Sequence, residues 1–147
     1  MPHNRFLGLF TIVGLAGCAS GPTTVTFPAA FARASCAPTD GPAVAVELSE
    51  SAKSEPLTPP LIRVYVYQSR SLASGKAWSL AAPYTEAIAT FCSSETACEN
   101  ATRGTVRFDP TSSADILSGT LDAIFPTKGA VQGPFRAIWR TTQSMCG

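Results

Sequence analysis

Two stretches of the chain alternate apolar side chains with small or polar ones at a period of two, over residues 44–49 and 62–67. Because successive side chains of a β-strand point to opposite faces, this alternation predicts two strands that each bury one face. Residues 51–60 between them include three prolines, which lack the N–H that a strand partner needs, so we expect a surface loop there. The apolar members of the two stretches are Val44, Val46, Leu48, Ile62, Val64 and Val66.

Five further stretches favour short strands, because they are bounded by turn residues and rich in β-branched and aromatic side chains. Residues 126–129 are expected to form the turn of a hairpin between residues 119–125 and 131–140. Pro134 indicates a bulge or an edge position in the second strand of this hairpin. We expect residues 86–91 and 104–108 to form another hairpin. A short helix after Pro83 is the alternative for residues 86–91. The five stretches are 77–80, 86–91, 104–108, 119–125 and 131–140.

The cysteines favour closure of this fold by two disulfides. Four remain when Cys18 is set aside, and four cysteines allow three pairings. We favour Cys92 with Cys98, across a short polar loop, and Cys36 with Cys146, which joins the two ends of the domain. A metal or catalytic pair is the alternative, but the chain has no CxxC spacing and no second histidine to complete a zinc site. Together these features predict an all-β fold, a small antiparallel β-sandwich or barrel of six to eight strands.

The first 17 residues have the composition of a signal peptide. Arg5 is their one cation, and residues 6–17 carry no charge. A run of about a dozen apolar residues is too short for a membrane-spanning helix, which needs about 20. Export from the cytoplasm is therefore expected, and persistent disulfides fit that compartment.

The run ends in Leu15, Ala16, Gly17 and Cys18, which resemble the lipobox of bacterial lipoproteins. The resemblance implies cleavage before Cys18 and attachment of diacylglycerol to its thiol, with further fatty acylation such as palmitate. An ordinary secretory signal cleaved nearby is the alternative. The next two residues include no aspartate, which in this family favours the outer membrane, on its periplasmic or surface face, over the inner membrane.

We therefore divide the chain into a signal peptide (1–17), a lipidated N-terminus and tether (18–35), and a β-rich domain (36–147). Within the tether, residues 24–27 have the composition of an edge strand, although the preceding Gly-Pro is typical of a linker. Eleven Lys and Arg face ten Asp and Glu in the full chain, and removal of Arg5 balances them. Because no basic cluster is present, we expect no nucleic-acid partner.

The scarcity of histidine excludes several kinds of catalytic site. His3 is the only histidine and leaves with the signal peptide, which excludes Ser-His-Asp and Cys-His catalysis as well as histidine-ligated metals. We expect no cofactor, no metal and no catalytic residue. An envelope hydrolase that uses paired carboxylates is the alternative, and its candidate acids are Glu47, Glu86, Asp109, Asp115 and Asp122.

Two groups of side chains at alternate positions are candidates for a binding face. Arg63, Tyr65 and Tyr67 form one group, and Arg136 and Arg140 lie on either side of Ile138 in the other. Arginine and tyrosine are enriched at protein interfaces. The competing interpretation is that the arginines only hydrate an outer face whose other side packs on the core.

We therefore expect a non-enzymatic envelope lipoprotein that binds a partner or has a structural role. Its partners would be the bilayer, through acylated Cys18, and an envelope protein or glycan. Residues 73–78 (Ala-Ser-Gly-Lys-Ala-Trp) resemble the Ser-Gly loop of small lipid-anchored β-barrels that inhibit lysozyme, which gives a second non-enzymatic alternative.

Overall fold

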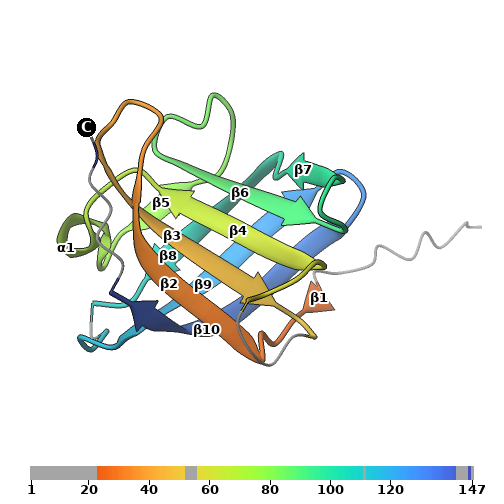
Figure 1. Cartoon of the computed structure of the whole chain (residues 1–147). Coiled ribbons are helices and arrows are strands. Elements are labelled where there is room, and N and C mark those ends of the chain that lie inside the picture. Colours follow the sequence, from red (N-terminus) through yellow and green to blue (C-terminus); the bar gives the residue numbers. More distant parts are fainter. Residues whose placement is uncertain (1–22, 52–55, 111, 142–145, 147) are drawn as a thin grey trace, which may run out of the picture.

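The computed structural model describes residues 23–51, 56–110, 112–141 and 146, and within them ten strands and one short helix are formed (Figure 1). The predicted all-β fold is thereby confirmed. The elements in chain order are β1 (Thr23–Thr24), β2 (Ala29–Cys36), β3 (Pro42–Ser49), β4 (Leu61–Val66), α1 (Arg70–Ala73), β5 (Ala77–Ser79), β6 (Ala87–Cys92), β7 (Cys98–Asn100), β8 (Arg103–Phe108), β9 (Ile116–Phe125) and β10 (Gly129–Arg140).

The strands belong to one sheet with the order β5-β8-β9-β10-β2-β3-β4-β6-β7, and β1 pairs with β10 beside this path. Most neighbours are antiparallel, but β10 runs parallel to both β1 and β2, so the sheet is mixed. Figure 1 shows the sheet curling until β2, β3, β4 and β6 lie in front of β8, β9 and β10. The fold therefore has more strands than the six to eight predicted, and two of its pairings are parallel.

The chain turns a corner between β7 and β8, which carries it from one layer of the curled sheet to the other. β7 pairs with β6, whereas β8 pairs with β9 and β5. At the corner, the Ala101 N–H bonds to the Ala89 carbonyl and the Thr102 N–H bonds to the Ile124 carbonyl, both at 2.8 Å. The expected hairpin of residues 86–91 with 104–108 is therefore wrong, because residues 98–100 take the place beside β6.

The interior of the curled sheet holds the main core. The six apolar residues predicted to face inward on β3 and β4 are each no more than 2% exposed. Aromatic rings from both layers meet inside, with Phe91 6.0 Å from Phe125 and Phe108 edge-on to Phe135 at 6.1 Å between ring centroids. The predicted strand pattern thus identifies the buried face correctly.

A smaller apolar cluster lies on the outside of the sheet. It joins Ala29 and Phe31 of β2 to Leu61 of β4 and to Leu57 in the proline-rich connection between β3 and β4. Leu57 is 7% exposed, so this part of the connection packs against the outer face. Part of the outer face is therefore covered by the chain's own residues.

β2 is an eight-residue strand between β3 and β10, and it lies on the N-terminal side of the boundary predicted at residue 36. Its inward side chains include Ala30 and Ala32, which are 5% and 1% exposed. β1 occupies part of the stretch proposed as an edge strand, and the Val25 N–H continues its pairing to the Gln132 carbonyl at 2.8 Å. Residues 86–91 form most of strand β6 and not the alternative helix.

Both predicted disulfides are present. Cys36 and Cys146 have Cα atoms 5.5 Å apart, and Cys92 and Cys98 have Cα atoms 4.0 Å apart. The first joins residues 110 positions apart in the chain and the second joins residues 6 positions apart. The long-range bridge ties the end of β2 to the C-terminal segment.

Glu99 of β7 braces the turn between β9 and β10. Its carboxylate accepts hydrogen bonds from the N–H groups of Thr127 at 3.0 Å and Lys128 at 2.9 Å. Desolvation alone would raise the pKa of Glu99, but hydrogen bonds from Lys128 and Thr127 hold it below its ordinary value. The hairpin predicted over residues 119–140 is thus formed, and hydrogen bonds to Glu99 of β7 hold its turn.

Candidate functional site: the arginine face

Strand register brings the predicted binding residues of β4 and β10 onto one outer surface. Opposite residues on paired strands point to the same face of a sheet. Two rows of outward side chains therefore run across the adjacent strands β10, β2, β3 and β4. One row is Ile138, Phe31, Glu47 and Arg63, and the other is Arg140, Arg33, Ala45 and Tyr65. We call the outward side chains of β10, β2, β3 and β4 the arginine face.

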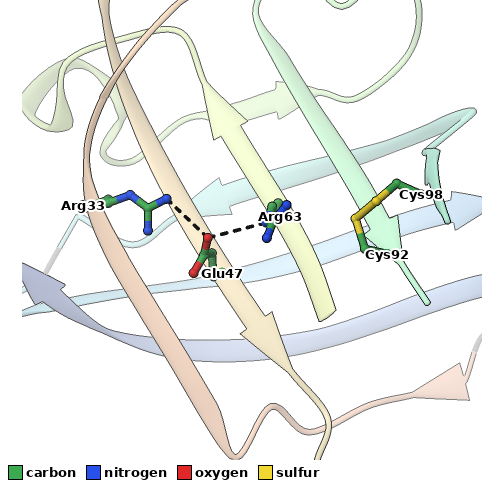
Figure 2. Close-up of polar contacts among 5 residues, drawn as sticks. All are labelled: Arg33, Glu47, Arg63, Cys92 and Cys98. Atoms are coloured by element: carbon green, nitrogen blue, oxygen red, sulfur yellow. Dashed lines mark hydrogen bonds and ion pairs between the residues drawn. A yellow bond between two sulfur atoms is a disulfide. The ribbon is translucent and has the colours of Figure 1, made fainter. Parts of the chain in front are cut away.

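A carboxylate between two guanidinium groups occupies the middle of this face (Figure 2). Arg33 Nη2 lies 3.3 Å and Arg63 Nε 3.5 Å from the same Glu47 oxygen, Oε1. The Glu47 side chain is 16% exposed, whereas those of Arg33 and Arg63 are 39% and 37% exposed. Such partly exposed pairs contribute at most about 1 kcal/mol each, so their main effect is to orient two arginines.

Beside this cluster lies a hollow of about 450 Å³. Arg33, Glu47 and Arg63 line it together with Pro56 and Leu57 of the connection between β3 and β4. The hollow therefore combines two guanidinium groups with an apolar wall. This chemistry suits an acidic group that is attached to an apolar one.

The β10 side of the face carries two further arginines. Arg136 is exposed, and the guanidinium of Arg140 lies 4.9 Å from the centre of the Phe31 ring. The strands β2, β3, β4 and β10 together carry four arginines and one acidic residue, Glu47. The face consequently has a formal excess of positive charge in a chain that is nearly balanced overall.

Arg70 of α1, which lies against the C-terminal end of β10, has a structural role. Arg70 stacks on the Trp139 ring at 4.3 Å and donates hydrogen bonds to the carbonyls of Ser113, Ala114 and Ile116. These contacts fix the connection between β8 and β9 against α1. Arg70 is therefore already engaged by the protein itself.

The five candidate carboxylates of the hydrolase alternative lie on separate elements. Glu47 is paired with arginines on β3, Asp122 points outward from β9, and Glu86 precedes β6. Asp109 and Asp115 both lie in the connection between β8 and β9. In the described part of the chain, no three His, Cys, Asp or Glu side chains gather as a metal site would require.

The Ser-Gly stretch at residues 73–78 connects α1 to β5. The Gly75 N–H bonds to the Phe108 carbonyl at 2.9 Å, and the indole N–H of Trp78 bonds to the Ala73 carbonyl at 3.2 Å. Trp78 itself is 7% exposed and belongs to the main core. The stretch therefore packs against β8 and anchors the short edge strand β5.

Sequence reasoning missed Arg33, because residues 18–35 were assigned to a tether. The strand around it alternates Phe31 and Arg33 with inward alanines, a pattern with little hydrophobic contrast. Tyr67, by contrast, was predicted for this face but borders a different hollow beyond the end of β4. Among the arginines and tyrosines, the arginine face thus gains Arg33 and loses Tyr67 relative to the predicted group.

Comparison of the chain with protein families, curated proteins and solved structures finds no match. The proposed signal peptide and Cys18 lie outside the described residues. In the part that is described, no helix has the length and hydrophobicity needed to cross a bilayer.

Proposed function

We propose that this chain is a lipid-anchored lipoprotein of a bacterial envelope, and that its folded domain binds an acidic partner protein without catalysing a reaction. The observation that carries the binding proposal is the arginine face. Four arginines and one carboxylate occupy the outward positions of four adjacent strands. The sheet presents them on one outer surface, so the binding groups are arranged before a partner arrives.

Arginine suits this role for physical reasons. Its planar guanidinium pairs with a carboxylate through two parallel hydrogen bonds and stacks on aromatic rings. Glu47 holds both Arg33 and Arg63, which reduces the conformational freedom they would lose on binding. The adjoining apolar surface of Leu57 and Pro56 adds a contact that a purely ionic patch lacks.

The lipid anchor rests on the resemblance of residues 15–18 to a lipobox. Thr23, where β1 begins, follows Cys18 by only five positions. At about 3.6 Å per residue this separation spans at most about 18 Å. An acylated Cys18 would therefore hold the β1 end of the domain next to the bilayer, and the sorting pattern after it favours the outer membrane.

The test is in-cell crosslinking of the full chain, followed by affinity capture and mass spectrometry. The double variant Arg63→Ala/Arg136→Ala should reduce recovery of a specific acidic protein by about tenfold or more, since interface arginines are often worth 1–2 kcal/mol each. The matched control is Arg103→Ala/Arg107→Ala, which removes two exposed arginines from β8 and should leave recovery unchanged.

Two results would contradict the proposal. Equal loss of the partner in both double variants would show that overall charge matters and the arginine face does not. Hydrolysis of an envelope polysaccharide by the purified chain, abolished by replacing one of the five candidate acids, would instead support the enzymatic alternative.

A further inference from the structure

A second hollow lies at the end of the sheet where β2 and β4 finish. Its volume is about 600 Å³, within the range typical of small-molecule sites. Its walls come from the turn between β2 and β3, from the residues after β4, and from residues 83–85 before β6 (Figure 1). Tyr67, Gln68 and Tyr84 line it together with Pro38, Pro42 and Pro83.

The walls of this hollow are held by the protein's own hydrogen bonds. In the β2–β3 turn, the Ala37 N–H bonds to the Gly41 carbonyl at 2.8 Å. The Tyr67 N–H bonds to the Glu86 carbonyl at 2.8 Å, and the Tyr84 hydroxyl donates to the Ala101 carbonyl at 2.9 Å. The hollow is thus formed in advance, which lowers the entropy lost when a ligand binds.

Backbone conformation also distinguishes this end of the molecule. Among the described residues, two other than glycine have positive φ, Asp40 and Tyr84, each at 60°. Asp40 lies in the β2–β3 turn, which forms one wall, and Tyr84 lines the hollow from the segment before β6. Aspartate adopts this conformation readily, but for tyrosine it is unusual and strained, as is often found at binding sites.

The lining chemistry indicates a neutral ligand. None of the residues that line the hollow is charged, so an ionised ligand group placed there would lack a counter-charge. The polar side chains are an amide and hydroxyls, and the tyrosine rings supply flat apolar faces. Burial, with a contribution from the nearby Tyr65, raises the pKa of Tyr67, so this phenol stays protonated at physiological pH.

We propose that this hollow binds a neutral saccharide, with a sugar ring stacked on Tyr67 and its hydroxyls bonded to groups such as the Gln68 amide. Sugars combine an apolar C–H face with several hydroxyls, which matches the combination of rings and neutral polar groups. A proline-rich peptide also favours aromatic grooves. However, the three wall prolines have no N–H to donate to its carbonyls.

The position of the hollow fits a glycan of the envelope. β1 pairs with β10 at Val131, whereas β2 pairs with β10 as far as Arg140. These two positions are about 30 Å apart along β10. The hollow therefore lies at the end of the sheet opposite β1. Its orientation relative to the membrane rests on the proposed lipid anchor, but saccharide binding itself does not.

The test is titration of the purified full chain in detergent with neutral oligosaccharides of N-acetylglucosamine, followed by calorimetry. Binding should be independent of salt and should weaken about tenfold or more in Tyr67→Ala. The matched control is Tyr65→Ala, which removes the tyrosine of the arginine face two positions away and should leave affinity unchanged. If Tyr67→Ala does not fold, Gln68→Ala replaces it.

Nuclear magnetic resonance of the wild-type chain gives a second measurement that needs no variant. Shifts on adding the oligosaccharide should be confined to residues 37–42, 67–68 and 83–85. Absence of binding, equal weakening in the two tyrosine variants, or preferential binding of a proline-rich peptide would overturn the proposal. Loss of the acidic partner in the Arg63→Ala/Arg136→Ala chain, with saccharide binding intact, would show that the two sites are independent.

Discussion

At the level of single residues, Gly104 is the clearest case of a position that accepts no other side chain. It lies just after the corner between β7 and β8 with φ of 142°, a conformation that other residues rarely adopt. A Cβ atom there would lie 2.1 Å from the Asp122 carbonyl oxygen of β9. Close approach of two backbones at the corner therefore depends on glycine.

We predict that Gly104→Ala lowers the free energy of unfolding by at least about 2 kcal/mol. The alanine would adopt a strained φ, and its Cβ would collide with the backbone of β9. Gly129→Ala separates these two causes, because Gly129 has φ of 83° but no atom within 4 Å of an added Cβ. It should cost about 1 kcal/mol. Chemical denaturation of the three chains measures both values, and equal losses would contradict the steric explanation.

Glu99 should make stability depend on pH in the acid range. Because the folded chain holds the pKa of Glu99 below its ordinary value of 4.5, its contribution is complete above that pH and is lost as the pH falls through the lowered value. Wild type should therefore exceed Glu99→Gln in unfolding free energy at neutral pH, and the gap should close below about pH 4. Urea unfolding at a series of pH values measures this, with Glu95→Gln as control.

At the level of elements, the two disulfides should differ in their contributions. A cross-link stabilises mainly by restricting the unfolded chain, and the effect increases with the loop it closes. Replacing both Cys36 and Cys146 by serine should lower the free energy of unfolding by about 4–5 kcal/mol. Replacing both Cys92 and Cys98 by serine should lower it by about 2 kcal/mol. Denaturant unfolding of the two double variants gives the order, and a larger loss for the Cys92–Cys98 variant would contradict it.

Which strands could be predicted depended on how strongly inward and outward side chains differ. β3 and β4 alternate valine, leucine and isoleucine with small or polar residues over most of their length, so their buried face was evident from sequence. β2 buries alanines, and alanine is common in loops as well as in cores. The corner after β7 was missed because β7 and β8 are separated by only two residues in sequence but pair with different neighbours.

The same limits apply to the arginine face. Arg63, Arg136 and Arg140 could be selected from sequence because their strands were recognised. Their position relative to one another could not, since it depends on β2 lying between β3 and β10. Arg33 belongs to that unrecognised strand, and only the register of β2 with β3 brings it to Glu47.

At the level of the whole molecule, attachment to the membrane should depend on one thiol. Cys18→Ala should leave the membrane fraction and lose labelling by palmitate, because no lipid can then be attached. Ser20→Ala, two positions away, is the matched control and should remain with membranes. Fractionation after a high-salt wash measures this, and a Cys18→Ala chain that stays membrane-bound would contradict the lipobox prediction.

The parallel pairing of β2 with β10 has a consequence for biogenesis. β2 takes as its neighbour β10, the last of the described strands to be synthesised, and the Cys36–Cys146 bridge joins the same two regions. If the chain is exported as proposed, β2 lacks the partner that completes the sheet for as long as β10 has not yet crossed the inner membrane. Under the proposed export route, folding waits until translocation is nearly finished and the chain stays unfolded until then. A chain that ended before β10 would leave β2 with an open edge.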